Sequence, residues 1–441
     1  MGRQRVIDVG LDSRRTTLAV SVGTFIAGYD NLLYGYFATV FAVVFFPPGN
    51  STAALIQTFL IFAVGFAARP LGGMFFGHVG DRVGRRPALV ASILSMALGT
   101  LGIGLLPTYA TIGLWAPALL LASRLLQGFS VGGEYVGANV MILEHAEHER
   151  AGRRVSANTV AGYLGIAAAG STSLLLATVL TDAQLTSWGW RLPFLFALPL
   201  VGVGLYLRLR IPDSPEFQEA KRVRFPLGTA LRHGWRGILV YGGWIVMVGL
   251  GGYVLHTYMA SYLKTVVGMD SAGAFGANLA AVVILAIGAV LGGILVDRYP
   301  PWIVGFTAAL GIALTVVPGF LIIRQGSVAA AILGQAMWGV CLGVAATLGS
   351  TLTKSQFPVE MRYTATAFAH NVTVTLFGTT APYVSAFLID RTGNRLAPAW
   401  YLVIMACVAM TVAMTALRKA SRGTVPAPGL PRGHARQRAM P

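Results

Sequence analysis

The chain has 441 residues, of which 55% are hydrophobic and 11% are charged, and its mean hydropathy is +0.68. Water-soluble globular proteins carry about a quarter charged residues, so this composition excludes a soluble globular protein and indicates one that lies in lipid. The net charge of +17 is an excess typical of nucleic-acid-binding proteins, but its distribution along the chain, described below, argues against such a partner.

A lipid bilayer is crossed by helices of about 20 mostly apolar residues. Twelve such segments are predicted, at 16–46, 52–77, 87–107, 111–143, 154–181, 190–210, 236–264, 273–296, 302–323, 327–353, 363–389 and 398–417. The longest polar break, 211–235, separates a first half (16–210) from a second half (236–418). We therefore expect an all-α integral membrane protein of two six-helix halves, with a cytoplasmic tail at 1–15 and a disordered basic tail at 419–441.

The first predicted helix carries an acid, Asp30, midway along its length. Ionisable side chains inside a membrane are costly and usually mark functional positions. Asp30 is therefore a candidate proton carrier. Two polar neighbours on the same helix, Asn31 and Tyr34, are candidate substrate ligands.

The loop after the second predicted helix combines glycines with charged residues. The glycines let helix ends approach closely and turn sharply, while the charges can form ion pairs that hold one face of the bundle closed. The alternative is that these charges only orient the chain in the membrane, but orientation needs basic residues and neither an acid nor spaced glycines. The residues of this predicted cytoplasmic gate are Gly77, Asp81, Arg82, Gly84, Arg85 and Arg86, with Glu144, Arg153 and Arg154 as candidate partners.

The fourth predicted helix contains Arg124, at about the depth of Asp30, and Glu134. We expect Asp30 and Arg124 to pair, so that protonation of Asp30 frees the guanidinium for an anionic substrate. The alternative is a static buried ion pair that only fixes helix packing, at a high desolvation cost. Glu134, about 15 Å further along the helix, is either a second proton site or part of the inner gate.

Other polar side chains inside the predicted helices are candidate substrate ligands. Arg69 either binds an anion or extends its side chain to the membrane interface. His370, followed by Asn371, suits a proton relay or a carboxylate ligand, although contact with a neighbouring helix explains a lone histidine as well. Asn139 and Asn158 either line a cavity or hydrogen-bond between helices.

A weak internal repeat relates the two halves. The Gly77-x-x-x-Asp81-Arg82 pattern recurs as Gly293-x-x-x-Asp297-Arg298, in each case at the cytoplasmic end of the second helix of its half. Parallel repeats with a substrate site between them are typical of secondary transporters. Asp297 and Arg298 therefore join the predicted gate. Tyr299-Pro300-Pro301 replaces the glycine and basic pair of the first copy, so we expect the gate to depend mainly on the first half.

The basic residues lie mostly in segments on the same side as the amino terminus, and the other side has only Lys264, Arg324, Arg391 and Arg395. This asymmetry places both termini in the cytoplasm and accounts for the net charge without nucleic acid. The apolar run after Thr17 is too long for a signal peptide. The two cysteines lie within predicted helices, so no disulfide framework or metal site is expected.

Several motifs resemble the major facilitator superfamily and, within it, the metabolite:proton symporters. The Gly77–Arg86 loop is similar to the superfamily's signature between its second and third helices, and Arg124–Glu134, followed by Glu144 and Arg150, resembles the symporter signature. The resemblance covers about residues 23–401. It implies the major facilitator fold, a bacterial inner membrane location, and proton-driven import by alternating access without a cofactor.

That family takes up small organic acids and zwitterions, and Phe25–Gly35 and Thr111–Pro117 are most similar to its citrate, tricarballylate and 2-oxoglutarate branches. The basic residues Arg69, Arg124 and His370 also favour an anion, so we expect a di- or tricarboxylate-like substrate. A zwitterionic or neutral metabolite, such as betaine, proline or shikimate, is the alternative. A membrane sensor would need a cytoplasmic output domain and an enzyme a catalytic cluster, neither of which is evident. We expect a monomer.

The chain also departs from the family pattern at two places. Ala27 occupies the position, three residues before Asp30, where the family usually has Glu, and the fifth helix offers Asn158 and Tyr163 in place of the usual aromatic-Gln pair. Both departures bear on the substrate and the proton number, and neither bears on the fold.

Overall fold

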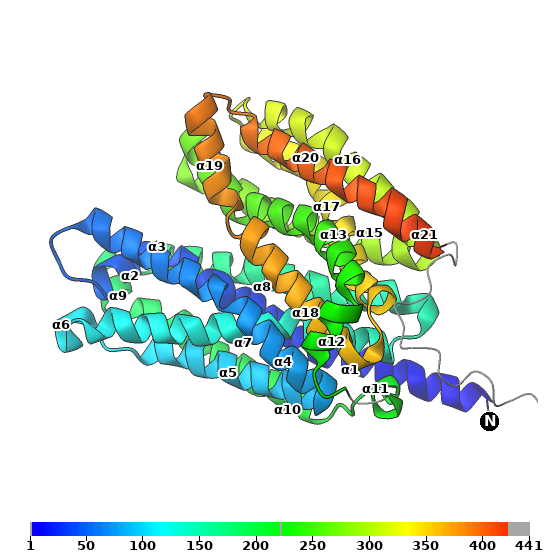
Figure 1. The fold of residues 1–441 in the computed structure, drawn as a ribbon. Coiled ribbons are helices and arrows are strands. Elements are labelled where there is room, and N and C mark those ends of the chain that lie inside the picture. Colours follow the sequence, from blue (N-terminus) through cyan, green and yellow to red (C-terminus); the bar gives the residue numbers. More distant parts are fainter. Residues whose placement is uncertain (1, 221–222, 422–441) are drawn as a thin grey trace, which may run out of the picture.

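The computed structural model describes residues 2–220 and 223–421, and all regular elements in those ranges are helices. Ten helical stretches there are long and apolar enough to cross a membrane. Two further long helices, α1 (Gly2–Tyr36) and α7 (Trp115–His145), are interrupted by polar residues such as Asp30 and Arg124. With these two, the described chain contains the twelve long crossings that the sequence predicts, and the all-α architecture is confirmed (Figure 1).

The first half follows the predicted order of helices. Its other helices are α2 (Ala38–Val44), α3 (Ser51–Ala67), α4 (Arg69–Arg82), α5 (Arg85–Leu105), α6 (Tyr109–Ile112), α8 (Ala151–Val179), α9 (Asp182–Ser187) and α10 (Leu192–Leu209). The second crossing is split at Ala68, because Pro70 lies in the first turn of α4 and cannot continue the hydrogen bonding of α3. Helix α1 starts at Gly2, so residues 2–15 of the predicted cytoplasmic tail are helical and continue into the first crossing.

The second half repeats this arrangement after two short connecting helices, α11 (Pro215–Glu219) and α12 (Pro226–His233). Its helices are α13 (Trp235–Tyr253), α14 (Met259–Tyr262), α15 (Ser271–Arg298), α16 (Pro301–Ile323), α17 (Val328–Gln356), α18 (Arg362–Thr373), α19 (Ala381–Thr392), α20 (Ala397–Val412) and α21 (Arg418–Ser421). The seventh and eleventh crossings contain π-helical turns, at Val254–Tyr258 and Val374–Gly378. Such wide turns occur frequently at functional sites. Residues 422–441 of the predicted tail lie outside the described residues.

Side-chain caps fix several helix starts on the face opposite the Gly77–Arg86 loop. The side chain of Asn50 accepts from the backbone N–H of Ala53, and Ser327 does the same for Ala330. Each cap satisfies an N–H that has no partner within its helix. On the other face, Gly84 separates α4 from α5 with φ of 152°, a left-handed conformation that favours glycine.

The two halves lie close together at one end of the bundle and separate toward the other (Figure 1). They meet where α4 packs on α18, α8 on α15 and α7 on α17. Near the Gly77–Arg86 loop the ribbons of α4, α11, α12 and α18 gather, whereas α2 and α3 diverge from α19 (Figure 1). The charge distribution assigns the gathered end to the cytoplasm, and we call it the cytoplasmic end. The structure therefore has its halves joined at the cytoplasm and parted outside.

The hydrophobic residues are arranged as in a protein surrounded by lipid. A buried cluster in the second half centres on Trp244 and Trp338, and another in the first half contains Phe41 and Trp190. Many large apolar side chains also face outward, among them Trp115 with 70% of its surface exposed. In water such an exposed apolar surface would promote aggregation, whereas in a bilayer it contacts the acyl chains.

Candidate functional site

A cavity of about 190 Å³ lies between the two halves near the middle of the bundle. Its walls come from α1, α4, α7 and α8 of the first half and from α13, α17, α18 and the π-helical turn at Val254–Tyr258 of the second. Its polar lining consists of Thr24, Asn31, Arg69, Tyr135, Thr159, Tyr163, Tyr253, His256, His370 and Asn371. Among the described lining residues there is one Arg or Lys and no Asp or Glu.

Arg69 provides the cation of this cavity. Its side chain is buried, Nη2 donates to Asn31 Oδ1 at 2.5 Å, and Nη1 donates to the Tyr253 hydroxyl at 3.1 Å. The guanidinium also stacks 4.0 Å from the centre of the Phe66 ring, and its Nε has no hydrogen-bond partner. No acid pairs with Arg69 among the described residues. A buried guanidinium held in place without a carboxylate is suited to bind one from a ligand.

Aromatic rings and histidines form much of the remaining wall. His370 lies 5.4 Å from the Tyr135 ring, centroid to centroid, and its Nδ1 is 3.4 Å from the Tyr241 hydroxyl. His256 lies 5.0 Å from the Tyr253 ring. The faces of such rings attract cations. The cavity therefore combines one fixed positive charge with surfaces that suit a positively charged organic group.

Asp30 lies beside this cavity but does not line it. Its side chain is 1% exposed and faces the interior of the first half, where Oδ1 accepts from Thr100 Oγ1 at 2.7 Å and from Gln127 Nε2 at 2.8 Å. Oδ2 has no partner. Arg124 Nη1 donates to Gln127 Oε1 at 2.8 Å. The expected direct pair between Asp30 and Arg124 is therefore wrong, since the amide of Gln127 stands between them.

Arg124 and Tyr34 also lie inside the first half instead of facing the cavity. The Arg124 guanidinium stacks 4.5 Å from the Tyr34 ring and 5.2 Å from the Phe62 ring. The Tyr34 hydroxyl donates to the Thr58 carbonyl at 3.0 Å. The depth of a residue in the membrane does not specify which neighbouring helix its side chain faces. The sequence therefore did not show that Arg69, and not Arg124, points into the cavity.

Glu134 is held within the first half by an ion pair with Arg208 of α10, and its Oε2 also accepts from Ser92 Oγ at 2.8 Å. Arg208 Nη1 donates in turn to the Leu89 carbonyl at 2.7 Å. The carboxylate lines neither the central cavity nor the contact between the halves. This placement ties α5, α7 and α10 together. A role as a second proton site stays a prediction. The position of Arg208 in the sequence, near the end of the predicted helix 190–210, does not indicate this ion pair.

Asn139 and Asn158 lie on the cytoplasmic side of the cavity in a hydrogen-bonded layer and do not line it. Asn158 Nδ2 donates to Asn139 Oδ1 at 2.9 Å, and Asn139 Nδ2 donates to Ser350 Oγ of α17 at 3.1 Å. Asn371 does line the cavity, and its Nδ2 donates to the Gly132 carbonyl at 2.7 Å. These contacts join the first half to α17 and α18 of the second.

The cytoplasmic end is closed by two carboxylates that each cap a helix of the opposite half. Asp81, at the end of α4, accepts from the backbone N–H groups of Tyr363 and Thr364 in the first turn of α18, at 3.1 and 2.8 Å. Asp297, at the end of α15, accepts from those of Gly152 and Arg153 in the first turn of α8, at 2.6 and 3.2 Å. In both caps the carboxylate binds the N–H groups of the second and third residues of the opposite helix. The internal repeat of the sequence therefore corresponds to two equivalent contacts in the structure.

Glycine permits the close packing behind the first of these caps. A Cβ on Gly77 would lie 2.6 Å from the Thr364 Cα, and a Cβ on Gly80 would meet the ring of Tyr363. Either methyl group would force α4 and α18 apart. Gly77 of the predicted gate and the nearby Gly80 are therefore placed where the two halves touch, whereas Gly84 lies against Asp213 of the connecting segment.

Arg85 joins the first cap to a buried ionic network. It donates to Asp81 at 2.6 Å and to Glu144 at 3.0 Å, and Glu144 also accepts from Arg362 of α18 at 3.0 Å. The Arg85 and Glu144 side chains have no exposed surface. A buried carboxylate between two guanidiniums is well compensated only while both halves are in contact.

The segment between the halves also takes part in this closure, which the sequence did not indicate. Asp213 accepts from the backbone N–H of Arg86 at 2.8 Å, and Ser214 Oγ donates to Glu144 at 2.6 Å. One turn on, Glu216 pairs with Lys354 at 2.6 Å and with Arg362 at 3.0 Å. In the sequence, the charged residues of this segment resemble those of any solvated loop. Only the three-dimensional structure therefore reveals that the segment contacts both halves.

Four arginines of the predicted gate lie at its margin. Arg82 and Arg298 are exposed, and no hydrogen bond or ion pair of their side chains is found among the described residues. Arg153 pairs with Asp297 at 3.6 Å through Nε, whereas Arg154 faces Arg14, Arg150 and Glu147 instead of the capping carboxylates. The working contacts of the gate are thus made by fewer residues than the motif contains.

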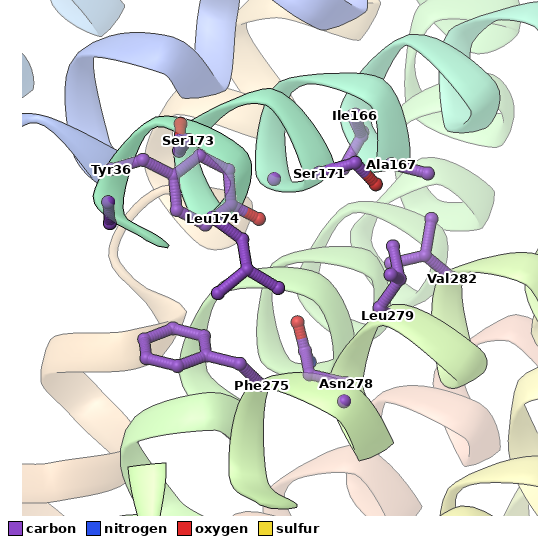
Figure 2. A pocket seen from close by; sticks show the side chains of 13 residues that line it. Tyr36, Ile166, Ala167, Ser171, Ser173, Leu174, Phe275, Asn278, Leu279 and Val282 are labelled. Carbon is purple, nitrogen blue, oxygen red and sulfur yellow. The ribbon is translucent and has the colours of Figure 1, made fainter. Parts of the chain in front are cut away.

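A second cavity, of about 210 Å³, lies between α8 and α15 toward the outer end (Figure 2). Tyr36, Ile166 and Leu174 form one wall, and Phe275 and Asn278 belong to the other. Asn278 Nδ2 donates to the Leu255 carbonyl at 2.6 Å, and its side-chain oxygen points into the cavity (Figure 2). Because its walls belong to different halves, this cavity changes shape whenever the halves move relative to each other.

Comparison with known proteins places these features in a family. The model of the Major Facilitator Superfamily matches residues 20–382. The chain is 33% identical to an ectoine/proline transporter of Corynebacterium glutamicum over 88% of its length and 81% of that protein's. It is 31% identical to a proline/betaine transporter of Escherichia coli, covering 96% of the chain and 87% of the relative. It is also 36% identical to the inner membrane metabolite transport protein YhjE of Escherichia coli, covering 90% and 92%.

Solved structures show the same fold. The proton:xylose symporter XylE bound to 6-bromo-6-deoxy-D-glucose superposes with a TM-score of 0.77 at 18% identity, over 93% of this chain and 96% of that one. The transporter FucP in the outward conformation superposes with a TM-score of 0.66 at 17% identity, over 90% and 97%. At these identities the likeness concerns the fold alone.

Proposed function

Because this chain belongs to the Major Facilitator Superfamily and to its metabolite:proton symporters, we propose that it imports a small zwitterion of the betaine or proline type together with protons. The protein is a multi-pass membrane transporter and not an enzyme. A location in the bacterial inner membrane is supported by the relative named as an inner membrane protein.

The observation that carries this proposal is the environment of Arg69. One guanidinium without an acid partner matches one carboxylate, and the surrounding tyrosine rings suit an ammonium group through cation–π attraction. Because the described lining contains no Asp or Glu, no fixed carboxylate in it competes with the substrate carboxylate for Arg69.

The expectation of a di- or tricarboxylate has weaker support. The relatives compared above are named for ectoine, proline and betaine where a substrate is named. A substrate with two or three carboxylates would also need more than the single Arg that lines the described cavity. The zwitterion alternative is therefore the better proposal.

For proton coupling, we propose Asp30. Its Oδ2 is buried without a partner, and the next residue along α1, Asn31, binds Arg69. A protonated carboxyl donates a hydrogen bond, whereas a carboxylate only accepts. A proton on Asp30 would therefore change its bonds to Thr100 and Gln127 and shift α1 against the cavity. Gln127 would pass this change to Arg124.

Alternating access would follow from the two ends of the bundle. Substrate enters from the outer end, where the halves diverge, and leaves when the caps made by Asp81 and Asp297 break (Figure 1). Both caps connect different halves, so a rocking motion of one half against the other breaks them together.

Ligand binding to the purified protein tests the substrate class. We expect glycine betaine, proline or ectoine to raise the Tm in a thermal-shift assay, because a ligand that binds only the folded state stabilises it. Citrate and 2-oxoglutarate serve as comparison ligands. A rise with these carboxylates and none with the zwitterions would overturn the proposed substrate.

A further inference from the structure

Between the central cavity and the cytoplasmic caps lies a small uncharged contact between the halves. Tyr135 of α7 lines the cavity, and its hydroxyl is 2.9 Å from Ser350 Oγ of α17. Asn139, one turn nearer the cytoplasm on α7, donates to the same Ser350 oxygen at 3.1 Å. Ser350 is 2% exposed. This oxygen is thus a meeting point of the two halves directly below the cavity.

The hydrogen bonds of Ser350 use its full capacity. A hydroxyl has one proton and can accept two hydrogen bonds. The proton is directed to the Ala346 carbonyl at 3.3 Å, and Asn139 Nδ2 can only donate, so it occupies one acceptor position. The geometry allows either hydroxyl of the Tyr135–Ser350 pair to donate. Because the Ser350 proton is directed to Ala346, we assign Tyr135 as the donor to the remaining position. The closed contact therefore depends on Tyr135 donating toward the cytoplasmic side.

Tyr135 has a single proton to donate. A molecule in the cavity that places an acceptor oxygen against the Tyr135 hydroxyl competes with Ser350 for that proton. Asn139 cannot replace the lost bond, because its amide already binds Ser350 and its oxygen accepts from Asn158. Ligand binding and closure of this contact therefore oppose each other.

We propose that Tyr135 and Ser350 form a ligand-sensitive gate, in which a carboxylate oxygen of the bound substrate takes the Tyr135 proton and so releases α17 from α7. This proposal rests on the proposed function, since it assigns the carboxylate of the same substrate. Tyr135 is a binding residue in this account, and Ser350 is a positioning residue that acts through it. The gate acts before the ionic contacts of Asp81, Asp297 and Glu144, which lie nearer the cytoplasm.

The distance between the cytoplasmic ends of the two halves tests this gate. Cys341 and Cys407 are the two cysteines of the chain, so Cys341→Ser and Cys407→Ser give a background without thiols. Spin labels then go on Leu209→Cys and Trp235→Cys, whose side chains are exposed at the cytoplasmic ends of α10 and α13. The distance distribution is measured in liposomes without ligand and with glycine betaine.

In this background, Ser350→Ala removes the bonds from both Tyr135 and Asn139, so it should raise the population of the longer, open distance without ligand by roughly 5- to 160-fold, the effect of two net hydrogen bonds. Glycine betaine should add little further opening, because the bond it breaks is already gone. Tyr135→Phe keeps the ring beside His370 and the bond from Asn139 to Ser350, so it should open the contact less, by roughly 2- to 13-fold, the effect of one net hydrogen bond. The double variant should open no further than Ser350→Ala alone. The matched control Thr351→Val, whose hydroxyl bonds only the Leu348 carbonyl of its own helix, should behave as the background does.

An unchanged ligand-free distance distribution in Ser350→Ala would overturn the gate. A ligand-free opening that leaves the full response to glycine betaine would overturn the competition for the Tyr135 proton, since loss of packing alone predicts that result. If glycine betaine fails to bind the background protein in the thermal-shift assay, the proposed function fails, while the ligand-free arm still decides whether Ser350 closes the cytoplasmic side.

Discussion

Arg69 and Asp30 differ in how their buried charges are compensated, and that difference separates binding from coupling. The Arg69 guanidinium has neutral partners, Asn31 and Tyr253, and faces a cavity. The Asp30 carboxylate also has neutral partners but faces the interior of its own half. A buried charge without an opposite charge is destabilising, so each position is expected to gain a counter-charge or a proton during the transport cycle.

Replacing Arg69 by Gln keeps hydrogen-bonding capacity toward Asn31 and Tyr253 but removes the charge. A hydrogen bond to a charged group contributes about 1.5–3 kcal/mol, so we expect the Kd for glycine betaine to rise by roughly 10- to 150-fold. Calorimetric titration of the purified protein measures this change. Arg324→Gln, at an exposed position of the outer end, is the control. Equal affinity in the two variants would mean that the carboxylate binds elsewhere.

Replacing Asp30 by Asn removes the titratable group and keeps an oxygen that accepts from Thr100. We expect this variant to lose accumulation driven by a pH gradient while retaining exchange of labelled for unlabelled substrate. Both are measured in proteoliposomes, with Asp182→Asn, at an exposed position on α9, as the control. Normal accumulation by Asp30→Asn would exclude Asp30 as the coupling residue.

At the scale of helices, the two capping carboxylates explain why a degraded repeat still closes. The sequence predicted a gate that includes Asp297 but depends mainly on the first half, because the glycine and basic pair of the second copy are replaced. The structure shows that capping needs only Asp297 and the first turn of α8. The first copy has an added role, since Asp81 also binds the buried Arg85.

Amide hydrogen exchange should distinguish the contribution of the Asp81 cap from that of the Asp297 cap. A cap contributes about 0.5–2 kcal/mol to its helix. We expect Asp81→Ala to accelerate amide exchange at the start of α18, around Tyr363, and Asp297→Ala to accelerate it at the start of α8, around Gly152. The first effect should be larger, because Arg85 also loses a partner. Faster exchange confined to the helix that carries the substitution would contradict a cap between halves.

At the scale of the whole molecule, the fold can be predicted from local features of the sequence. Apolar length predicts the twelve crossings, and polar breaks predict where they end, because the bilayer imposes both. The exceptions are also local: Pro70 splits the second crossing, and α1 continues through the predicted amino-terminal tail.

The site was less predictable, because its contacts depend on the direction of each side chain. Membrane depth places Asp30 level with Arg124, yet Gln127 lies between them. Asn139 and Asn158 have side chains suited to binding a substrate, but Asn158 bonds Asn139, and Asn139 bonds Ser350 of the other half. The contacts of Asp213 and Glu216 depend on how the connecting segment folds back onto the bundle, which no local pattern specifies.

The most direct test of the account is uptake of labelled glycine betaine and proline into proteoliposomes that contain the purified protein. With the lumen made alkaline relative to the medium, we expect accumulation above the external concentration, and a protonophore should abolish it. Substrate should only equilibrate when both sides have equal pH and no membrane potential is present. Accumulation of citrate in place of these zwitterions, or accumulation unaffected by the protonophore, would contradict proton-driven zwitterion import.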